Sequence, residues 1–181
     1  MDTQLFFLLN SFAGQNPALD FFIVFLAKYL AYILIALLFV WLVFSEYLRK
    51  DKIVIGSSAL ISGWISRYGF GTPLRYLWHR PRPLDALHVH QLLVEHSYSF
   101  PSGHATFLFG LSSLLYLYNK KIGIVSFVAT LLITVARVAA GVHYPSDIFA
   151  GMIFGMISAW ITFRYVAPLL KRHMVYKIQW L

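Results

Sequence analysis

The sequence contains no cysteine and few charged residues, and both shortages restrict what the protein is. Without cysteine, the 181-residue chain forms neither a disulfide framework nor a metal site built on thiolates. Charged residues make up 12% of the chain and hydrophobic residues 59%, whereas soluble domains are about a quarter charged and half apolar. With a mean hydropathy of +0.68, this composition predicts an integral membrane protein.

Acidic residues are the scarcest charged type, with seven Asp and Glu against fifteen Lys and Arg, which gives a formal net charge of +8. A basic excess can indicate nucleic-acid binding, but here the basic residues form no run or stripe and alternate with apolar segments. We therefore expect no nucleic-acid partner and interpret the charges as signals of membrane topology.

Five apolar segments are long enough, together with their flanks, to predict membrane-spanning helices. They are residues 21–44, 53–70, 101–118, 122–138 and 147–170. No basic region precedes the first segment, so we interpret it as a span and not as a signal peptide. A shorter apolar segment, residues 3–12, is expected to form an interfacial helix. The sequence thus predicts a single all-α domain over residues 1–181, a polytopic membrane helix bundle with about five spans.

The distribution of Lys and Arg predicts how the bundle is oriented. Alternate connections carry the basic groups Arg49, Lys50 and Lys52; Lys120 and Lys121; and Lys171, Arg172 and Lys177. The positive-inside rule places these in the cytoplasm, with the N-terminus outside and the C-terminus inside. The remaining connections then face outside, although they hold Arg75, Arg80, Arg82 and Arg137. Because these arginines do not follow the positive-inside rule, we interpret them as residues that bind an anion.

Three polar segments are predicted to meet at this outer face. In one-letter code they read RYLWHRPRP at residues 75–83, PSGH at 101–104 and RVAAGVHYPSD at 137–147. PSGH opens a helix, where free N–H groups bind anions such as phosphate, and the planar fork of arginine matches phosphate oxygens. His143 and Asp147 are four residues apart, so the carboxylate can hold one ring nitrogen and leave the other free to react.

These residue types together predict a phosphoryl-transfer site that uses no metal. One histidine would attack phosphorus and the other would protonate the leaving oxygen. The outer loops between spans hold only Asp85 and Glu95 as further acids, too few for a Mg²⁺ cage. Four more histidines, at positions 79, 88, 90 and 96, fit no compact metal-ligand spacing. We therefore expect neither a metal nor another cofactor.

The spacing R-x6-RP, PSGH and R-x5-H-x3-D resembles the three-part signature of the type 2 phosphatidic acid phosphatase (PAP2) superfamily, in the family's order. The family usually has Lys in place of Arg75 and Ser in place of Ala136. The short N-terminal helix, the long first span and the segments VEHSYSFPSGH and GVHYPSDI further resemble bacterial undecaprenyl-pyrophosphate phosphatases associated with bacitracin resistance.

The resemblance implies a role for each motif residue. His143 would be the nucleophile that forms a phosphohistidine, Asp147 would orient it, and His104 would protonate the departing lipid phosphate and then activate water. The residues implied to hold the phosphoryl oxygens are Arg75, Arg82, Ser102, Gly103 and Arg137. Further candidates for substrate contacts are Arg80, Glu95 and His96, and Arg80 fits an interfacial cation equally well.

The implied function is hydrolysis of a polyprenyl diphosphate, such as undecaprenyl diphosphate, to the monophosphate and orthophosphate. The expected place is the outer surface of a bacterial plasma membrane, where the reaction recycles the carrier lipid of peptidoglycan synthesis. The motif spacing fits a phosphatidic acid or phosphatidylglycerophosphate phosphatase equally well, and a phosphohistidine can also pass its phosphate to an alcohol. An anion transporter is a remote alternative, because the charges cluster at one face and not along a path. The sequence carries no signal for the oligomeric state.

Overall fold

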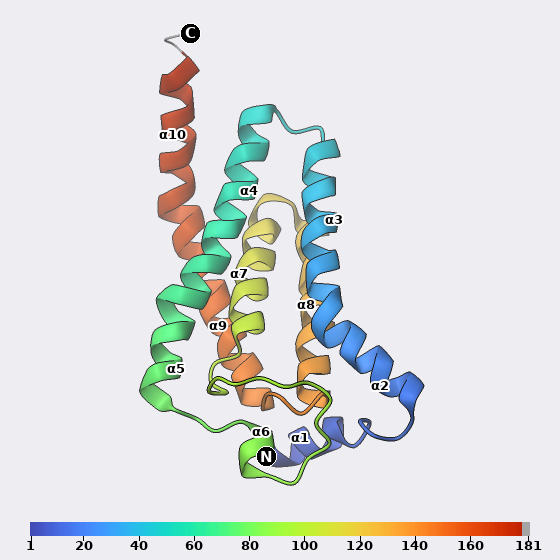
Figure 1. The fold of residues 1–181 in the computed structure, drawn as a ribbon. Helices are drawn as coiled ribbons and strands as arrows, with labels where there is room; N and C mark the ends of the chain where they lie inside the picture. Colours follow the sequence, from blue (N-terminus) through green and yellow to red (C-terminus); the bar gives the residue numbers. More distant parts are fainter. Residues whose placement is uncertain (179–181) are drawn as a thin grey trace.

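The computed structural model describes residues 1–178, with side chains through His173, and is helical with no strand in that range (Figure 1). The α-helices are α1 (Asp2–Asn10), α2 (Pro17–Val24), α3 (Leu30–Phe44), α4 (Arg49–Trp64), α5 (Thr72–Trp78), α6 (Pro83–Ala86), α7 (Gly103–Tyr118), α8 (Lys120–Ala139), α9 (Pro145–Ile161) and α10 (Ala167–Ile178). Three π-helical segments, η1 (Phe25–Tyr29), η2 (Ile65–Gly71) and η3 (Thr162–Val166), join neighbouring helices without a break. The side chain of Lys177, used in the topology prediction, lies outside the described residues.

Each predicted span falls on a helix, which confirms the all-helical class. Three continuous helices are long and apolar enough to cross a membrane: Pro17–Phe44, Lys120–Ala139 and Pro145–His173. The other two predicted spans fall on the helix that runs through α4, η2 and α5 and on the 16-residue α7, neither of which is among those three. The total of five spans therefore stays a prediction.

Helix α7 is the centre of the bundle and packs against α4, α8 and α9. The contact with α9 is close because glycines meet there: a Cβ added to Gly155 would lie 2.6 Å from the backbone nitrogen of Gly110. On the α4 side, the Ser62 hydroxyl donates to the carbonyl of Gly110 (2.8 Å), and the Ser158 hydroxyl of α9 donates to the carbonyl of Ser62 (2.6 Å). Three helices therefore fix the position of α7 and of the segment at its start.

The helix containing α4 continues past Pro73, although the sequence pattern predicted its end near Phe70. Proline lacks an N–H group and its ring clashes with the carbonyl four residues earlier in a regular α-helix. The π-helical segment η2 precedes Pro73, and its hydrogen bonds run five residues back, as from the N–H of Thr72 to the carbonyl of Arg67. This wider register accommodates the proline, so the helix extends to Trp78. The connection to α7, which contains the short α6, begins after that residue.

Helix α1 crosses one end of the bundle, next to α8 and α9 (Figure 1). Its Phe6 is fully buried in a cluster with Phe109 and Tyr144, whereas Leu8 is exposed. Asn10 is also buried, and its side-chain amide donates to the carbonyl of Ala139 (2.8 Å). The predicted interfacial helix is therefore an integral part of the fold, with one apolar face turned outward.

Candidate active site

The structure brings together the three polar segments that the sequence predicted to meet, at the end of the bundle that holds α1 and α6 (Figure 1). The helix end at α5 and the loop after it carry the first segment, the start of α7 carries the second, and the turn between α8 and α9 carries the third. The central side chains are almost completely buried, with His143 1% exposed and Arg82 and Arg137 each 2% exposed.

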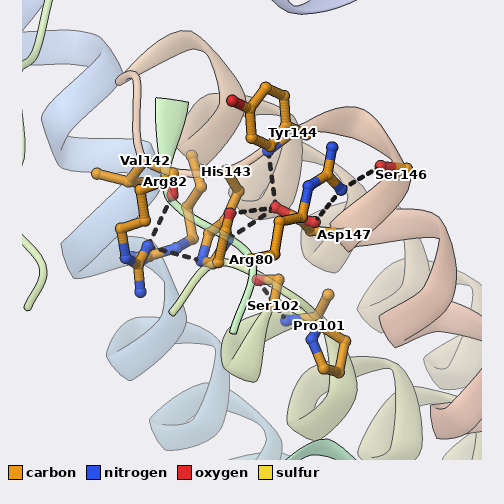
Figure 2. Close-up of polar contacts among 12 residues, drawn as sticks. Arg80, Arg82, Pro101, Ser102, Val142, His143, Tyr144, Ser146 and Asp147 are labelled. Carbon is orange, nitrogen blue, oxygen red and sulfur yellow. Dashed lines mark hydrogen bonds and ion pairs between the residues drawn. The ribbon is translucent and has the colours of Figure 1, made fainter. Parts of the chain in front are cut away.

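His143 presents its two ring nitrogens to different partners, as Figure 2 shows. Its Nδ1 lies 3.4 Å from Oδ2 of Asp147, and its Nε2 lies 3.4 Å from Nη1 of Arg82. When Nδ1 carries the proton that faces the carboxylate, Nε2 has a free lone pair. Gly141 shapes the turn before it, since its φ of +82° favours glycine and an added Cβ would lie 2.8 Å from the carbonyl oxygen of His90.

The surroundings of His143 keep its ring neutral. Burial lowers its pKa from 6.5 to about 4, and the positive charges of Arg137 and Arg82 act in the same direction, while Asp147 opposes them. A neutral imidazole has the lone pair that a nucleophile needs, so the site favours the reactive form of His143 at neutral pH.

Asp147 is completely buried, and every contact of its carboxylate is with a donor. The Ser99 hydroxyl and the Tyr144 N–H (2.9 Å) donate to Oδ2, and Nη1 of Arg80 donates to Oδ1 (2.6 Å; Figure 2). Together with His143, these groups use both carboxylate oxygens and hold the carboxylate in one orientation. The sequence predicted that Asp147 orients His143, and the geometry of this pair supports that role.

Arg80 binds the carboxylate oxygen of Asp147 that does not face His143. Its guanidinium joins Asp147 to Asp2 of α1 (2.7 Å) and stacks over the ring of Tyr144, 4.0 Å from the centroid. Asp2 also accepts from the backbone N–H (2.9 Å) and hydroxyl (2.6 Å) of Ser146. Arg80 thus has a structural ion pair on both sides, and its contact with substrate stays a prediction.

Asp2 is a site residue that sequence reasoning missed. An acid in the first turn of a helix is an ordinary partner of the helix dipole, so its position alone gives no signal of a distant contact. The set of Asp2, Arg80, Ser99, His143 and Asp147 is called the nucleophile network below.

Three further arginines, Arg75, Arg82 and Arg137, form what we call the arginine cradle. Nη2 of Arg75 donates to the carbonyl of Pro101 (2.8 Å), and Nη1 of Arg82 donates to the carbonyl of Val142 (2.7 Å). The Nε atoms of Arg75 and Arg137 are buried and have no hydrogen-bond partner among the described residues. Buried donors without an acceptor are costly, and phosphate oxygens would satisfy them.

Glu95 is the one acid that pairs with the cradle within the described side chains. Its carboxylate lies 2.5 Å from Nη2 of Arg137 and 3.9 Å from Nη2 of Arg82. Burial raises the pKa of Glu95, but Arg137 and Arg82 outweigh this effect and hold the pKa below its usual value. Glu95 therefore carries one negative charge against three positive ones, which leaves the cradle suited to a further anion.

A cavity of 670 Å³ borders the cradle on the loop side, with Arg75, Arg82 and Glu95 in its wall. His96 also lines this cavity and is exposed. The predicted substrate contacts at Glu95 and His96 are thus placed next to the candidate phosphate position, Glu95 through its ion pairs and His96 at the cavity wall.

The start of α7 supplies a different set of backbone donors from the one we expected. The N–H of Ser102 donates to the backbone carbonyl of Asp147 (3.2 Å), and the Ser102 hydroxyl accepts from the N–H of Ala105 (3.4 Å). Among the described residues, the N–H groups of Gly103 and His104 have no partner. The N–H groups of Gly103 and His104 are therefore available to an anion, whereas that of Ser102 is not, and the contact of this helix start with phosphate stays a prediction.

The His104 side chain is half-buried, and its ring has no hydrogen-bond partner within the described part of the chain. In residues 1–173, no group of three or more His, Asp or Glu side chains is arranged to hold a metal ion.

Comparisons with known proteins agree with this geometry. The profile of the PAP2 superfamily matches residues 52–171. The chain is 30% identical to the undecaprenyl-diphosphatase BcrC of Bacillus subtilis (strain 168), over 91% of this chain and 84% of that protein. It is 31% identical to the undecaprenyl-diphosphatase of Sulfolobus acidocaldarius, over 90% and 75% of the two chains. The crystal structure of Aquifex aeolicus LpxE is similar, with a TM-score of 0.73, 32% identity and coverage of 91% of this chain and 95% of that one.

Proposed function

Because the chain belongs to the PAP2 superfamily, a family of phosphatases, we propose that it hydrolyses a polyprenyl diphosphate, such as undecaprenyl diphosphate, to the monophosphate and orthophosphate. Two relatives that are at least 30% identical over most of the chain carry the name undecaprenyl-diphosphatase, which favours this substrate. Hydrolysis of this diphosphate would return the carrier lipid to peptidoglycan synthesis.

One observation carries the proposal: a buried His143 lies between a carboxylate at Nδ1 and an arginine at Nε2. The carboxylate fixes the ring and stabilises the positive charge that develops when Nε2 attacks phosphorus. The arginines and the start of α7 supply donors for the three phosphoryl oxygens, where negative charge accumulates in the transition state. No other part of the described chain combines these groups.

In the first step, the lone pair on Nε2 of His143 forms a bond to the terminal phosphorus of the diphosphate. The bond from this phosphorus to the bridging oxygen breaks, and its electron pair stays on the departing lipid monophosphate. His104 enters this step protonated, with its positive charge stabilised by the bound diphosphate, and gives that proton to the oxygen, which leaves a phosphohistidine at position 143.

In the second step, His104 takes a proton from a water molecule whose oxygen attacks the same phosphorus. The bond from phosphorus to Nε2 breaks and its electron pair returns to His143, so orthophosphate is released and both histidines regain their starting states. Attack by an alcohol in place of water would make the same site a phosphotransferase.

We place this site at the outer face of a bacterial plasma membrane, with the N-terminus outside and the C-terminus in the cytoplasm. The N-terminus and the end of α10 at Ile178 lie at opposite ends of the bundle, and the site is at the N-terminal end (Figure 1). The basic groups of the α3–α4 turn, around Arg49, lie at the other end, which supports this orientation through the positive-inside rule.

Orthophosphate release by the purified protein in detergent tests the function, with undecaprenyl diphosphate and phosphatidic acid compared at equal surface concentration in the presence of EDTA. We expect turnover that is insensitive to EDTA and a preference for the diphosphate of at least about tenfold in kcat/KM. Equal or reversed preference would assign the protein to phospholipid metabolism. No release from either lipid would contradict the phosphatase mechanism.

Brief incubation with substrate labelled with ³²P in the terminal phosphate tests the intermediate separately. The label should bind covalently to the protein, survive base and be lost in mild acid, as a phosphohistidine does. Because His104 is assigned to both steps, His104→Ala should acquire the label more slowly and, in a chase with unlabelled substrate, lose it more slowly than the parent protein. Absence of label in His143→Ala, with normal label in the parent protein, would locate the intermediate.

A further inference from the structure

A fourth arginine, Arg67 of η2, reaches the same place as the arginine cradle although it lies outside the three motifs. A Cβ added to Gly103 would lie 2.8 Å from Nη1 of Arg67 and 3.0 Å from Nη2 of Arg75. Both guanidinium groups therefore touch the start of α7, where the N–H groups of Gly103 and His104 are free of partners among the described residues.

The π-helical segment explains why Arg67 and Arg75 point the same way. In a regular α-helix, residues eight apart point in directions about 80° from each other. A π-helical turn contains one extra residue, so Arg67 and Arg75 are related as two residues seven apart are in a regular α-helix. Residues seven apart lie on the same face of the helix. Without η2, either Arg67 or Arg75 would point away from Gly103.

Arg67 has no acidic partner among the side chains of residues 1–173. The ion pairs in that range use Arg80, Arg82, Arg137, His143 and Lys171 as the basic groups. The described contacts of the Arg67 guanidinium are the ring of Tyr68, 5.6 Å from the centroid, and the start of α7. Burial, followed by the charge of Arg67, lowers the pKa of Arg75, so the two cations repel each other. Two neighbouring cations without a carboxylate between them favour a highly charged anion.

We infer that Arg67 binds the phosphate that leaves with the lipid, and that it separates diphosphate substrates from phosphate monoesters; this inference rests on the proposed function. The backbone of Arg67 precedes that of Arg75 by eight residues on a helix that runs toward the loop end of the bundle, so it lies roughly 10 Å farther from that end, and the Arg67 guanidinium reaches Gly103 from that side (Figure 1). A lipid tail stays in the membrane, so the phosphate attached to the tail approaches from the Arg67 side. The terminal phosphate then occupies the cradle next to His143.

The variant Arg67→Ala tests this role in steady-state assays of orthophosphate release. We expect kcat/KM for the polyprenyl diphosphate to fall about 10- to 100-fold, because a charge-assisted contact to the leaving phosphate is lost. The value for phosphatidic acid, whose single phosphate lies in the cradle, should change less than about threefold. Arg67→Lys keeps the charge but loses the fork, so it should recover part of the diphosphate activity.

Arg164→Ala is the matched control. Arg164 also lies in a π-helical segment, η3, and stacks beside the tyrosine that follows it, 5.5 Å from the ring centroid, but it lines a cavity with Tyr47 and Asp51 outside the site. Its replacement removes an arginine from a similar helical setting, and both activities should stay within about twofold of the parent. A loss for both substrates in Arg67→Ala, with Arg164→Ala unaffected, would make Arg67 part of the common cradle and overturn the inference.

Binding of inorganic pyrophosphate and orthophosphate separates this inference from the proposed function. Calorimetry with His143→Ala and with the double variant His143→Ala, Arg67→Ala should show pyrophosphate binding weakened about 10- to 100-fold and orthophosphate binding changed less than threefold. Equal losses for both anions, or no loss for either, would overturn the role of Arg67. If the parent protein cleaves only monoesters, the proposed substrate fails, and the pyrophosphate result alone then decides the role of Arg67.

Discussion

The nucleophile network and the arginine cradle lie on opposite sides of His143, and they differ in how completely their charges are paired. In the network, the carboxylate of Asp147 receives donors on both oxygens, and Arg80 bridges it to Asp2. In the cradle, one carboxylate, that of Glu95, faces Arg82 and Arg137, while Nε atoms remain without acceptors within the described residues.

The difference indicates that the two sides perform different tasks. A fully paired network has one low-energy arrangement and holds the ring of His143 in place before any substrate binds. A cradle with excess positive charge gains stability only when an anion enters, so its interactions are available for substrate and transition state. Changes in the network should therefore lower kcat, whereas changes in the cradle should mostly change how phosphate binds.

The largest effect is expected from His143→Ala, which removes the proposed nucleophile. Turnover of the diphosphate should fall at least about 10⁴-fold, since the proposed mechanism depends on a covalent intermediate at this residue. Phosphate binding should persist because the cradle remains. Orthophosphate release and calorimetric binding of orthophosphate measure the two effects, and substantial residual turnover would mean that the nucleophile lies elsewhere.

Arg75→Ala should show the next largest effect, because it removes a guanidinium that we propose to bind the phosphoryl oxygens and whose buried Nε has no partner among the described residues. We expect kcat/KM to fall about 10²- to 10³-fold. Arg75→Lys keeps the positive charge that the PAP2 family usually has at this position, so it should retain more activity than Arg75→Ala. Arg49→Ala, at the other end of the bundle, serves as control and should leave kcat/KM unchanged.

The lowered pKa of His143 predicts that its ring stays neutral at a pH at which ordinary histidines are protonated. An ordinary histidine with a pKa of 6.5 is only about 3% neutral at pH 5, whereas burial and the cradle lower the pKa of His143 to about 4, so most of its rings are neutral there. Nuclear magnetic resonance of labelled histidine rings, assigned with His143→Ala, measures this titration directly. A midpoint near pH 6.5 would contradict the described environment.

The lowered pKa of His143 also determines how protonation of this residue changes the stability of the fold. The unfolded chain binds a proton at His143 more readily than the folded one, because the folded pKa is lower. This contribution to stability is complete above about pH 6.5 and is lost as the pH falls toward 4. Thermal unfolding of the parent and of His143→Ala should therefore diverge across that interval.

The three motif segments could be predicted to meet because their order and spacing resemble the signature of the PAP2 superfamily. The start of α7 at Gly103 and the turn that carries His143 agree with that prediction, and the helix start follows from Pro101 and Ser102. The helical class followed from hydropathy alone, since apolar segments of this length must satisfy their backbone groups internally.

The remaining features depend on tertiary contacts or on helix register. Asp2 reaches Arg80 only because α1 folds under the bundle, and no local pattern records a contact across 78 positions. The continuation of a helix through Pro73 depends on a π-helical register, which hydropathy does not reveal. Arg67 lies within the apolar segment 53–70, where an arginine has to face the bundle interior or a polar cavity, but its approach to Gly103 requires the relative positions of two helices.

Asp2→Asn tests whether the nucleophile network positions His143 through residues that do not contact it. Asparagine preserves the size of the side chain but removes the charge that holds Arg80, so Asp147 and His143 should be less well oriented. We expect kcat to fall about tenfold with little change in KM, which is the pattern of a positioning residue. Asp20→Asn is the matched control, because Asp20 accepts from the N–H of Gly14 in the same terminal region. A rise in KM with unchanged kcat would place Asp2 among the binding groups.

The smallest expected effect concerns Glu95, the acid that partly neutralises the cradle. Its carboxylate competes with phosphate for Arg137 and Arg82, and the arginines keep its pKa low enough for it to be ionised at neutral pH. Glu95→Gln should therefore bind orthophosphate about three- to tenfold more tightly, with stronger product inhibition, while His143 remains oriented. Asp85→Asn, which changes an acid at the wall of the same cavity but outside these ion pairs, is the control. Weaker phosphate binding in Glu95→Gln would mean that Glu95 holds the cradle arginines in position instead of competing with phosphate for them. The groups on both sides of His143 would then be positioned by paired charges.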